Sequence, residues 1–166
     1  MMKLARSPEI IKTTATFDLS ETYRYRLRRE WGDGPAVAFL MLNPSTADAE
    51  ADDPTVRRCI RYAQAWGFGA LEVVNLFALR STDPAALYTH HDPIGPENDA
   101  AILACRREVE LMVAAWGAHG ALHGRGVHVL DMLKIHGPIH YLKMTLGGQP
   151  GHPLYLPKDL KPMEIA

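Results

Sequence analysis

The chain has 166 residues, of which 47% are hydrophobic and 22% are charged, and its formal net charge at pH 7 is −1. This length and composition are ordinary for a soluble globular protein, so we expect one domain over residues 1–166. The near-neutral charge excludes proteins that bind nucleic acid or anionic membranes through their overall charge. A nucleic-acid enzyme of this composition would need a local basic patch.

Cysteine content and the N-terminus indicate the compartment. Cys59 and Cys105 are too few for a disulfide framework and favour reduced, partly buried thiols. Residues 1–7 lack the apolar core of a signal peptide, and no apolar run reaches the length of a membrane span. We therefore expect a cytoplasmic protein that has no membrane partner.

The first part of the chain predicts an antiparallel hairpin followed by a strand and a helix. Residues 13–31 alternate with period two, which places tyrosine and leucine on one face and arginine on the other. The arginines of this face are Arg24, Arg26 and Arg28, with Arg29 beside them, and ion pairing is their default role. An apolar run at 36–42 predicts a buried strand. Asp53 and Pro54 predict the N-cap and first position of a helix that extends to about residue 66.

Strands and helices then alternate. Further buried strands are expected at 71–77, 110–116 and 139–144, and helices at 96–108 and 127–134. The polar stretch at 80–95 is long for a loop inside a compact domain, and such loops are usually functional or mobile. This alternation predicts an α/β sandwich around a short four-stranded parallel sheet, with the N-terminal antiparallel hairpin added to it.

Polar residues follow the predicted strands where each strand ends. They are Asn43-Pro44, Asn75-Leu76, Trp116-Gly117 and the loop residues His152-Pro153. Parallel strands end at the same edge of a sheet, where ligands bind in open α/β folds. We therefore expect these groups to form one ligand site.

The same residues carry two resemblances. Over residues 17–156 the chain is similar to a bacterial and phage family catalogued as domain of unknown function 1643. Its recurring features are matched by residues 42–48, 52–55, 75–77, 116–117 and 152–155. In the order and character of these motifs the chain also resembles the uracil-DNA glycosylase superfamily. The first motif lacks both glycines of that superfamily, and Leu154 replaces the serine of its His-Pro-Ser motif.

The resemblance to the glycosylases implies a three-layer α/β/α fold and hydrolysis of an N-glycosidic bond, in DNA or in a nucleoside or nucleotide. It implies that Asn43 positions the attacking water and that His152 stabilises the departing base. Phe77 or Tyr155 would stack on that base. The substrate-binding set is Pro44, Ser45, Thr46, Asn75, Phe77, Trp116 and Tyr155, and Arg57 and Arg58 could bind phosphate.

Other interpretations of these residues stay open. Asn75 is also suited to cap a turn, His152 to brace its loop, and Trp116 to fill the core. Residues 46–53 add several carboxylates, of which Asp48 and Asp52 could bind Mg²⁺ in a phosphohydrolase. The missing glycines and this acidic segment favour a module that binds a nucleotide or nucleic acid without cleaving it.

We expect no cofactor and no metal. The histidines lack the spacing of a zinc site, and the two cysteines exclude the four-cysteine iron–sulfur cluster of some glycosylases. The expected partner is a nucleobase-containing ligand or DNA. The sequence predicts no oligomeric state.

Overall fold

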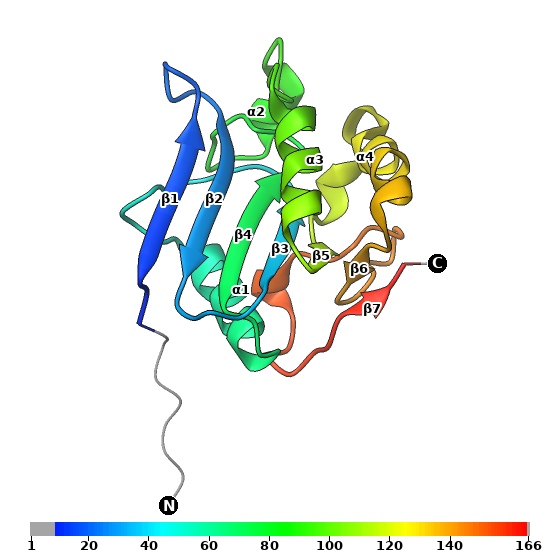
Figure 1. Ribbon diagram of the computed structural model, residues 1–166. Helices are drawn as coiled ribbons and strands as arrows, with labels where there is room; N and C mark the ends of the chain where they lie inside the picture. Colours follow the sequence, from blue (N-terminus) through cyan, green and yellow to red (C-terminus); the bar gives the residue numbers. More distant parts are fainter. Residues whose placement is uncertain (1–8, 166) are drawn as a thin grey trace, which may run out of the picture.

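The computed structural model describes residues 9–165, and its strands form one mixed sheet (Figure 1). Within these residues, seven strands lie in the order β1-β2-β4-β3-β5-β6-β7. Their bounds are β1 Lys12–Phe17, β2 Arg24–Glu30, β3 Ala36–Met41, β4 Ala70–Asn75, β5 Leu111–Ala114, β6 His140–Tyr141 and β7 Met163–Glu164. The α-helices are α1 Pro54–Ala65, α2 Ala85–Thr89, α3 Asn98–Glu108 and α4 Arg125–Leu133. Short 3-10 segments lie at Ala118–Gly124, Lys134–His136 and Pro153–Tyr155.

The four parallel strands expected from the sequence form the centre of this sheet. Strand β3 pairs in parallel with β4 and β5, and β5 pairs in parallel with β6. The expected four-stranded sheet is nevertheless too small. The hairpin of β1 and β2 joins the same sheet because β2 pairs antiparallel with β4, and β7 pairs antiparallel with β6. Strand β7 has two residues, too few to produce a readable alternation.

Helices cover both faces of the sheet, and β3 shows why. Its side chains alternate between two cores: Ala38 and Leu40 pack under α3 and α4, whereas Val37, Phe39 and Met41 pack against α1. Figure 1 shows α3 and α4 on one face and α1 on the other. All six residues of β3 are buried, as expected of a parallel strand that is covered on both sides.

The start of α1 is as predicted from the sequence. Asp53 is the N-cap, its side chain accepts a hydrogen bond from the backbone N–H of Val56, and Pro54 is the first helical residue. This cap fixes the helix start directly after the loop that leaves β3. The N-terminus of α1 therefore lies at the carboxyl edge of the sheet, beside the ends of the parallel strands.

Some elements differ from the expectation. The stretch 80–95 contains the short helix α2, and the fourth parallel strand is confined to His140–Tyr141. None of the helices within residues 9–165 is long and apolar enough to cross a membrane. Residues 1–7, whose composition lacks a signal-peptide core, lie outside the described residues.

Candidate functional site

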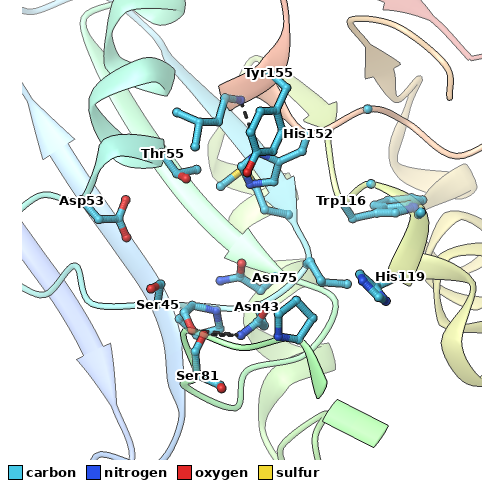
Figure 2. A pocket seen from close by; sticks show the side chains of 18 of the residues that line it. Asn43, Ser45, Asp53, Thr55, Asn75, Ser81, Trp116, His119, His152 and Tyr155 are labelled. Atoms are coloured by element: carbon cyan, nitrogen blue, oxygen red, sulfur yellow. Dashed lines mark hydrogen bonds between the residues drawn. The ribbon is translucent and has the colours of Figure 1, made fainter. Parts of the chain in front are cut away.

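A cavity of about 630 Å³ opens at the carboxyl edge of the parallel strands (Figure 2). Its volume lies in the range of pockets that bind small ligands. It is lined by seven of the residues singled out in the sequence: Asn43, Pro44, Ser45, Asn75, Trp116, His152 and Tyr155. The strand ends therefore do meet, because β3, β4 and β5 run in the same direction.

Asn43 lies two residues beyond β3 and is held by the polar stretch that follows β4. Its amide nitrogen donates to the carbonyl oxygens of Ser81 at 2.9 Å, Pro44 at 3.1 Å and Leu79 at 3.4 Å. These bonds use the nitrogen and leave the amide oxygen to accept from a ligand or a water. Figure 2 shows Asn43 beside Ser81 and close to Asn75.

Asn75 is the last residue of β4, and its side chain is 1% exposed. Neither its amide nitrogen nor its amide oxygen has a hydrogen-bond partner among the described residues, although both atoms are buried. Buried amides are nearly always hydrogen-bonded, and leaving one unpaired costs about 1–3 kcal/mol. Because Asn75 lines the cavity, a ligand with an adjacent donor and acceptor would complete its bonding.

The backbone around Asn75 is fixed from the side of α3 and α4. The amide nitrogen of Asn98, which is wholly buried, donates to the carbonyl oxygens of Asn75 at 2.8 Å and of Leu76 at 3.0 Å. Arg125 donates through Nε to the same Leu76 oxygen at 2.8 Å and pairs with Asp99. These contacts hold the end of β4 rigid, so the side chain of Asn75 keeps its position at the cavity.

His152 begins the 3-10 turn Pro153–Tyr155, and its ring lines the cavity. Its Nδ1 accepts a hydrogen bond from the backbone N–H of Leu154, which leaves Nε2 as the protonated nitrogen of a neutral ring. Burial lowers the pKa of His152, and the more distant charge of Asp53 only partly opposes this effect. A neutral imidazole at this position is a hydrogen-bond donor at neutral pH. Tyr155, at the rim, is 83% exposed and offers a free ring face.

Trp116 forms a wall of the cavity and also belongs to the core. Its side chain is 2% exposed, and its indole N–H donates to the Oε1 of Gln149 at 2.8 Å. A Cβ on Gly120 would lie 1.9 Å from the ring, so only glycine lets the following turn pass this close. The interpretation of Trp116 as a core residue is therefore correct for most of its surface.

Four of the predicted ligand residues lie outside the cavity. Phe77 is wholly buried in the core and has no face to stack on a base. Thr46 is exposed on the loop after Ser45. Arg57 donates to the carbonyl oxygen of Asp52, and Arg58 donates to that of Leu156. Both arginines hold loops in place, and neither lines the cavity.

The acidic segment is ordered by a buried arginine. Arg29, 1% exposed, pairs with Asp52 at 2.7 Å and donates to the carbonyl oxygens of Asp48 and Ala51. Asp48 in turn accepts the backbone N–H groups of Glu50 and Ala51 at 2.8 Å each. The carboxylates of Asp48 and Asp52, which the phosphohydrolase hypothesis requires as Mg²⁺ ligands, are therefore already hydrogen-bonded within the protein. Residues 9–165 contain no group of three or more histidine, cysteine or acidic side chains that could hold a metal ion.

Several lining residues were not expected from the sequence. Arg24, 2% exposed, lines the cavity instead of forming ion pairs on the strand face, because the pairing of β1 and β2 shifts register between Thr16 and Phe17. A register shift leaves no trace in the alternation of polar and apolar residues. Thr55, Ser81 and His119 also line the cavity. His119 lies only a few residues after the end of β5 along the chain, and this short separation could have indicated that it lines the cavity.

The arrangement suits a planar polar ligand. Asn75 lies between Asn43 on one side and His152 on the other (Figure 2). The cavity thus places the amide of Asn75 between a hydrogen-bond acceptor, the amide oxygen of Asn43, and a donor, the Nε2 of His152. Asp53 is the only carboxylate among the described residues that line the cavity. Both of its oxygens already accept backbone N–H groups, from Val56 and Ala47. The site therefore offers neutral hydrogen-bonding groups and the guanidinium of Arg24, and its carboxylate is already engaged.

Comparison with protein families identifies the family of this chain. The model of a family described as "Protein of unknown function (DUF1643)" matches residues 24–154, which include the cavity residues discussed above except Tyr155. No curated protein and no solved structure matches the chain.

Proposed function

This chain belongs to the DUF1643 family, and we propose that its cavity binds a nucleobase-containing ligand and hydrolyses the N-glycosidic bond of that ligand. The observation that carries the proposal is the unpartnered amide of Asn75 at the cavity. An amide donates and accepts side by side, which matches the adjacent acceptor and donor on the edge of a pyrimidine. Binding such an edge would satisfy both buried atoms.

Hydrolysis needs a positioned water and a group that stabilises the departing base. The amide oxygen of Asn43 can hold the water, since its amide nitrogen is occupied by three carbonyl oxygens. The water oxygen bonds to the sugar carbon as the carbon–nitrogen bond breaks, and the bonding electrons leave with the base. His152 donates from Nε2 to a base oxygen as negative charge develops there. The proton released by the water finally neutralises the base.

The resemblance to the uracil-DNA glycosylase superfamily is part of this proposal. It includes the three-layer fold of that superfamily and DNA as one form of the substrate. It rests on the motif order: Asn43 after β3, Asn75 at the end of β4, Trp116 after β5, and then the loop of His152.

The test is release of a free base. The full chain is incubated with pyrimidine and purine nucleosides, nucleotides and oligonucleotides that carry damaged bases, and free bases are measured by chromatography. We expect Asn43→Ala and His152→Ala to lose base release while remaining folded. His128→Ala is the matched control, because His128 lies exposed on α4 outside the cavity. Release that both cavity variants retain would contradict the proposal, as would the absence of release from every substrate.

A second function has one observation in its favour. Asp53, the single carboxylate that the described residues bring to the cavity, is engaged as the N-cap of α1, so this part of the chain supplies no free carboxylate as a strong general base. The same cavity could then bind a nucleotide or nucleic acid without cleaving it. Thermal stabilisation by a ligand of the same panel, with no base released from it, would identify this binding function.

A further inference from the structure

We propose that Arg24 forms an anion subsite of the cavity that binds the phosphoryl group of a nucleotide. The inference deepens the proposed function and rests on it for the position of the base. It narrows the ligand class to nucleotides, either free or within a nucleic-acid strand. Nucleosides and free bases are then expected to bind more weakly. The sequence suggested Arg57 and Arg58 for this role, but both donate to backbone carbonyl oxygens of loops and neither lines the cavity.

Arg24 is the first residue of β2, and its guanidinium is buried with few partners. Nη1 donates to the carbonyl oxygen of Ala47 at 2.9 Å. Nε is buried and has no hydrogen-bond partner, and Arg24 forms no salt bridge within residues 9–165. Arg29 on the same strand shows the contrast, since its guanidinium bonds one carboxylate and three carbonyl oxygens.

The charge of Arg24 is poorly compensated inside the protein. Burial lowers its pKa to about 10, which the attraction of Asp53 only partly reverses. Asp53 itself accepts two backbone N–H groups and caps α1, so its negative charge is already stabilised locally. A buried cation without an ion pair is costly, and an anion that binds beside it would remove that cost.

The surroundings of Arg24 add donors to the subsite. The N-terminus of α1, a helix of twelve residues, opens onto the cavity, where Thr55 and Ser45 contribute hydroxyl groups. Figure 2 shows Thr55 and Ser45 on the side of Asp53, across from Trp116 and His119, with Asn75 between the two sides. Because Pro54 has no N–H and that of Val56 bonds to Asp53, α1 favours phosphate here mainly through its helix dipole. A base at Asn75 and a phosphate toward α1 would thus fit one cavity.

The test compares ligands that differ only in the phosphate. Calorimetry at low ionic strength measures the wild-type affinity for uridine and cytidine against their 5′-monophosphates. A charge-assisted, bidentate contact predicts nucleotides that bind about tenfold tighter or more. We expect Arg24→Gln to remove this preference while the affinity for nucleosides stays unchanged. Arg28→Gln is the matched control, because Arg28 lies on the same strand, pairs with Glu72 and does not line the cavity.

A second measurement covers the case in which Arg24→Gln does not fold. Inorganic phosphate is titrated into the ¹⁵N-labelled wild-type protein while the Nε–H resonance of Arg24 is followed by NMR. A saturable shift of this resonance supports the subsite even if no nucleoside binds, an outcome in which the base-binding proposal alone fails. Equal affinities for nucleosides and nucleotides with an unmoved resonance would overturn the inference. A nucleotide preference that Arg24→Gln retains would overturn it too.

Discussion

Replacing Asn75 by leucine should make the protein more stable and abolish ligand binding. The two side chains branch at the same atom and have nearly the same shape, so leucine exchanges two unpartnered polar atoms for two methyl groups. Asn75 is 1% exposed, and neither of its amide atoms has a partner among the described residues. The substitution therefore removes an unpaired amide without removing a hydrogen bond.

The size of the effect follows from the cost of the unpaired amide. A buried polar group without a partner costs about 1–3 kcal/mol, and because Asn75 lies at the cavity we take about 2 kcal/mol from the middle of that range. For a chain of this size, about 2 kcal/mol corresponds to a rise of about 4–8 °C in Tm. Polar residues at functional sites are often kept at a cost in stability, so a gain in stability on replacing Asn75 would be consistent with a functional role for it.

Urea denaturation of Asn75→Leu and Asn98→Leu measures the effect against a matched control. Asn98 is also buried, but its amide nitrogen bonds two carbonyl oxygens at the end of β4, so its replacement should lower the free energy of unfolding by about 2 kcal/mol. If Asn75→Leu is also destabilising by more than about 1 kcal/mol, the Asn75 amide is already satisfied in the folded protein. The argument for a ligand at that amide would then fail.

Three further predictions concern packing and charge. Glu72→Ala should lower the free energy of unfolding by about 2 kcal/mol in urea, because it removes the buried carboxylate shared by Arg26 and Arg28 and leaves them their more exposed partners, Glu108 and Glu30. Gly120→Ala should cost about 3 kcal/mol or more, since its Cβ would overlap the ring of Trp116, whereas Gly147→Ala, with its nearest atom at 3.9 Å, should be tolerated. Burial lowers the pKa of His152 in the folded protein below its value in the unfolded chain. The contribution of neutral His152 to stability is therefore complete above the unfolded pKa, and it declines as the pH falls from that value toward the folded pKa. His152→Gln should therefore lose less stability than the wild type between pH 7.5 and 5.5, as measured by urea midpoints, and an equal loss would contradict this assignment.

The strand ends could be predicted from the sequence because they depend on local patterns. Apolar runs that stop at Asn43, Asn75 and Trp116 identify parallel strands, and parallel strands must end at one edge. The N-cap Asp53 with Pro54 is equally local and occurs as predicted. These features depend on neighbours only a few residues away along the chain.

The hydrogen-bond partners and the burial of each site residue depend on contacts distant in the chain and could not be predicted. The side-chain amide of Asn43 has three carbonyl partners and that of Asn75 has none among the described residues, although both follow similar apolar runs. Two of the carbonyl partners of Asn43 lie more than thirty residues later in the chain. Phe77 was expected to stack on a ligand, but it lies in the core, where its backbone N–H still pairs with the carbonyl oxygen of Leu42. The cavity position of Arg24 depends on a register shift between β2 and β1, in which Tyr25 of β2 is the extra residue.

The central place of β3 in the sheet has a consequence for biosynthesis. Its six uncharged residues, 36–41, leave the ribosome long before both partners, since β4 begins at residue 70 and β5 at residue 111. Until then both hydrogen-bonding edges of this strand are open, a state that promotes aggregation. The strand that delivers Asn43 to the cavity therefore needs protection while its partner strands are made, and low temperature, which weakens the hydrophobic contacts that drive aggregation, should improve the yield of folded protein.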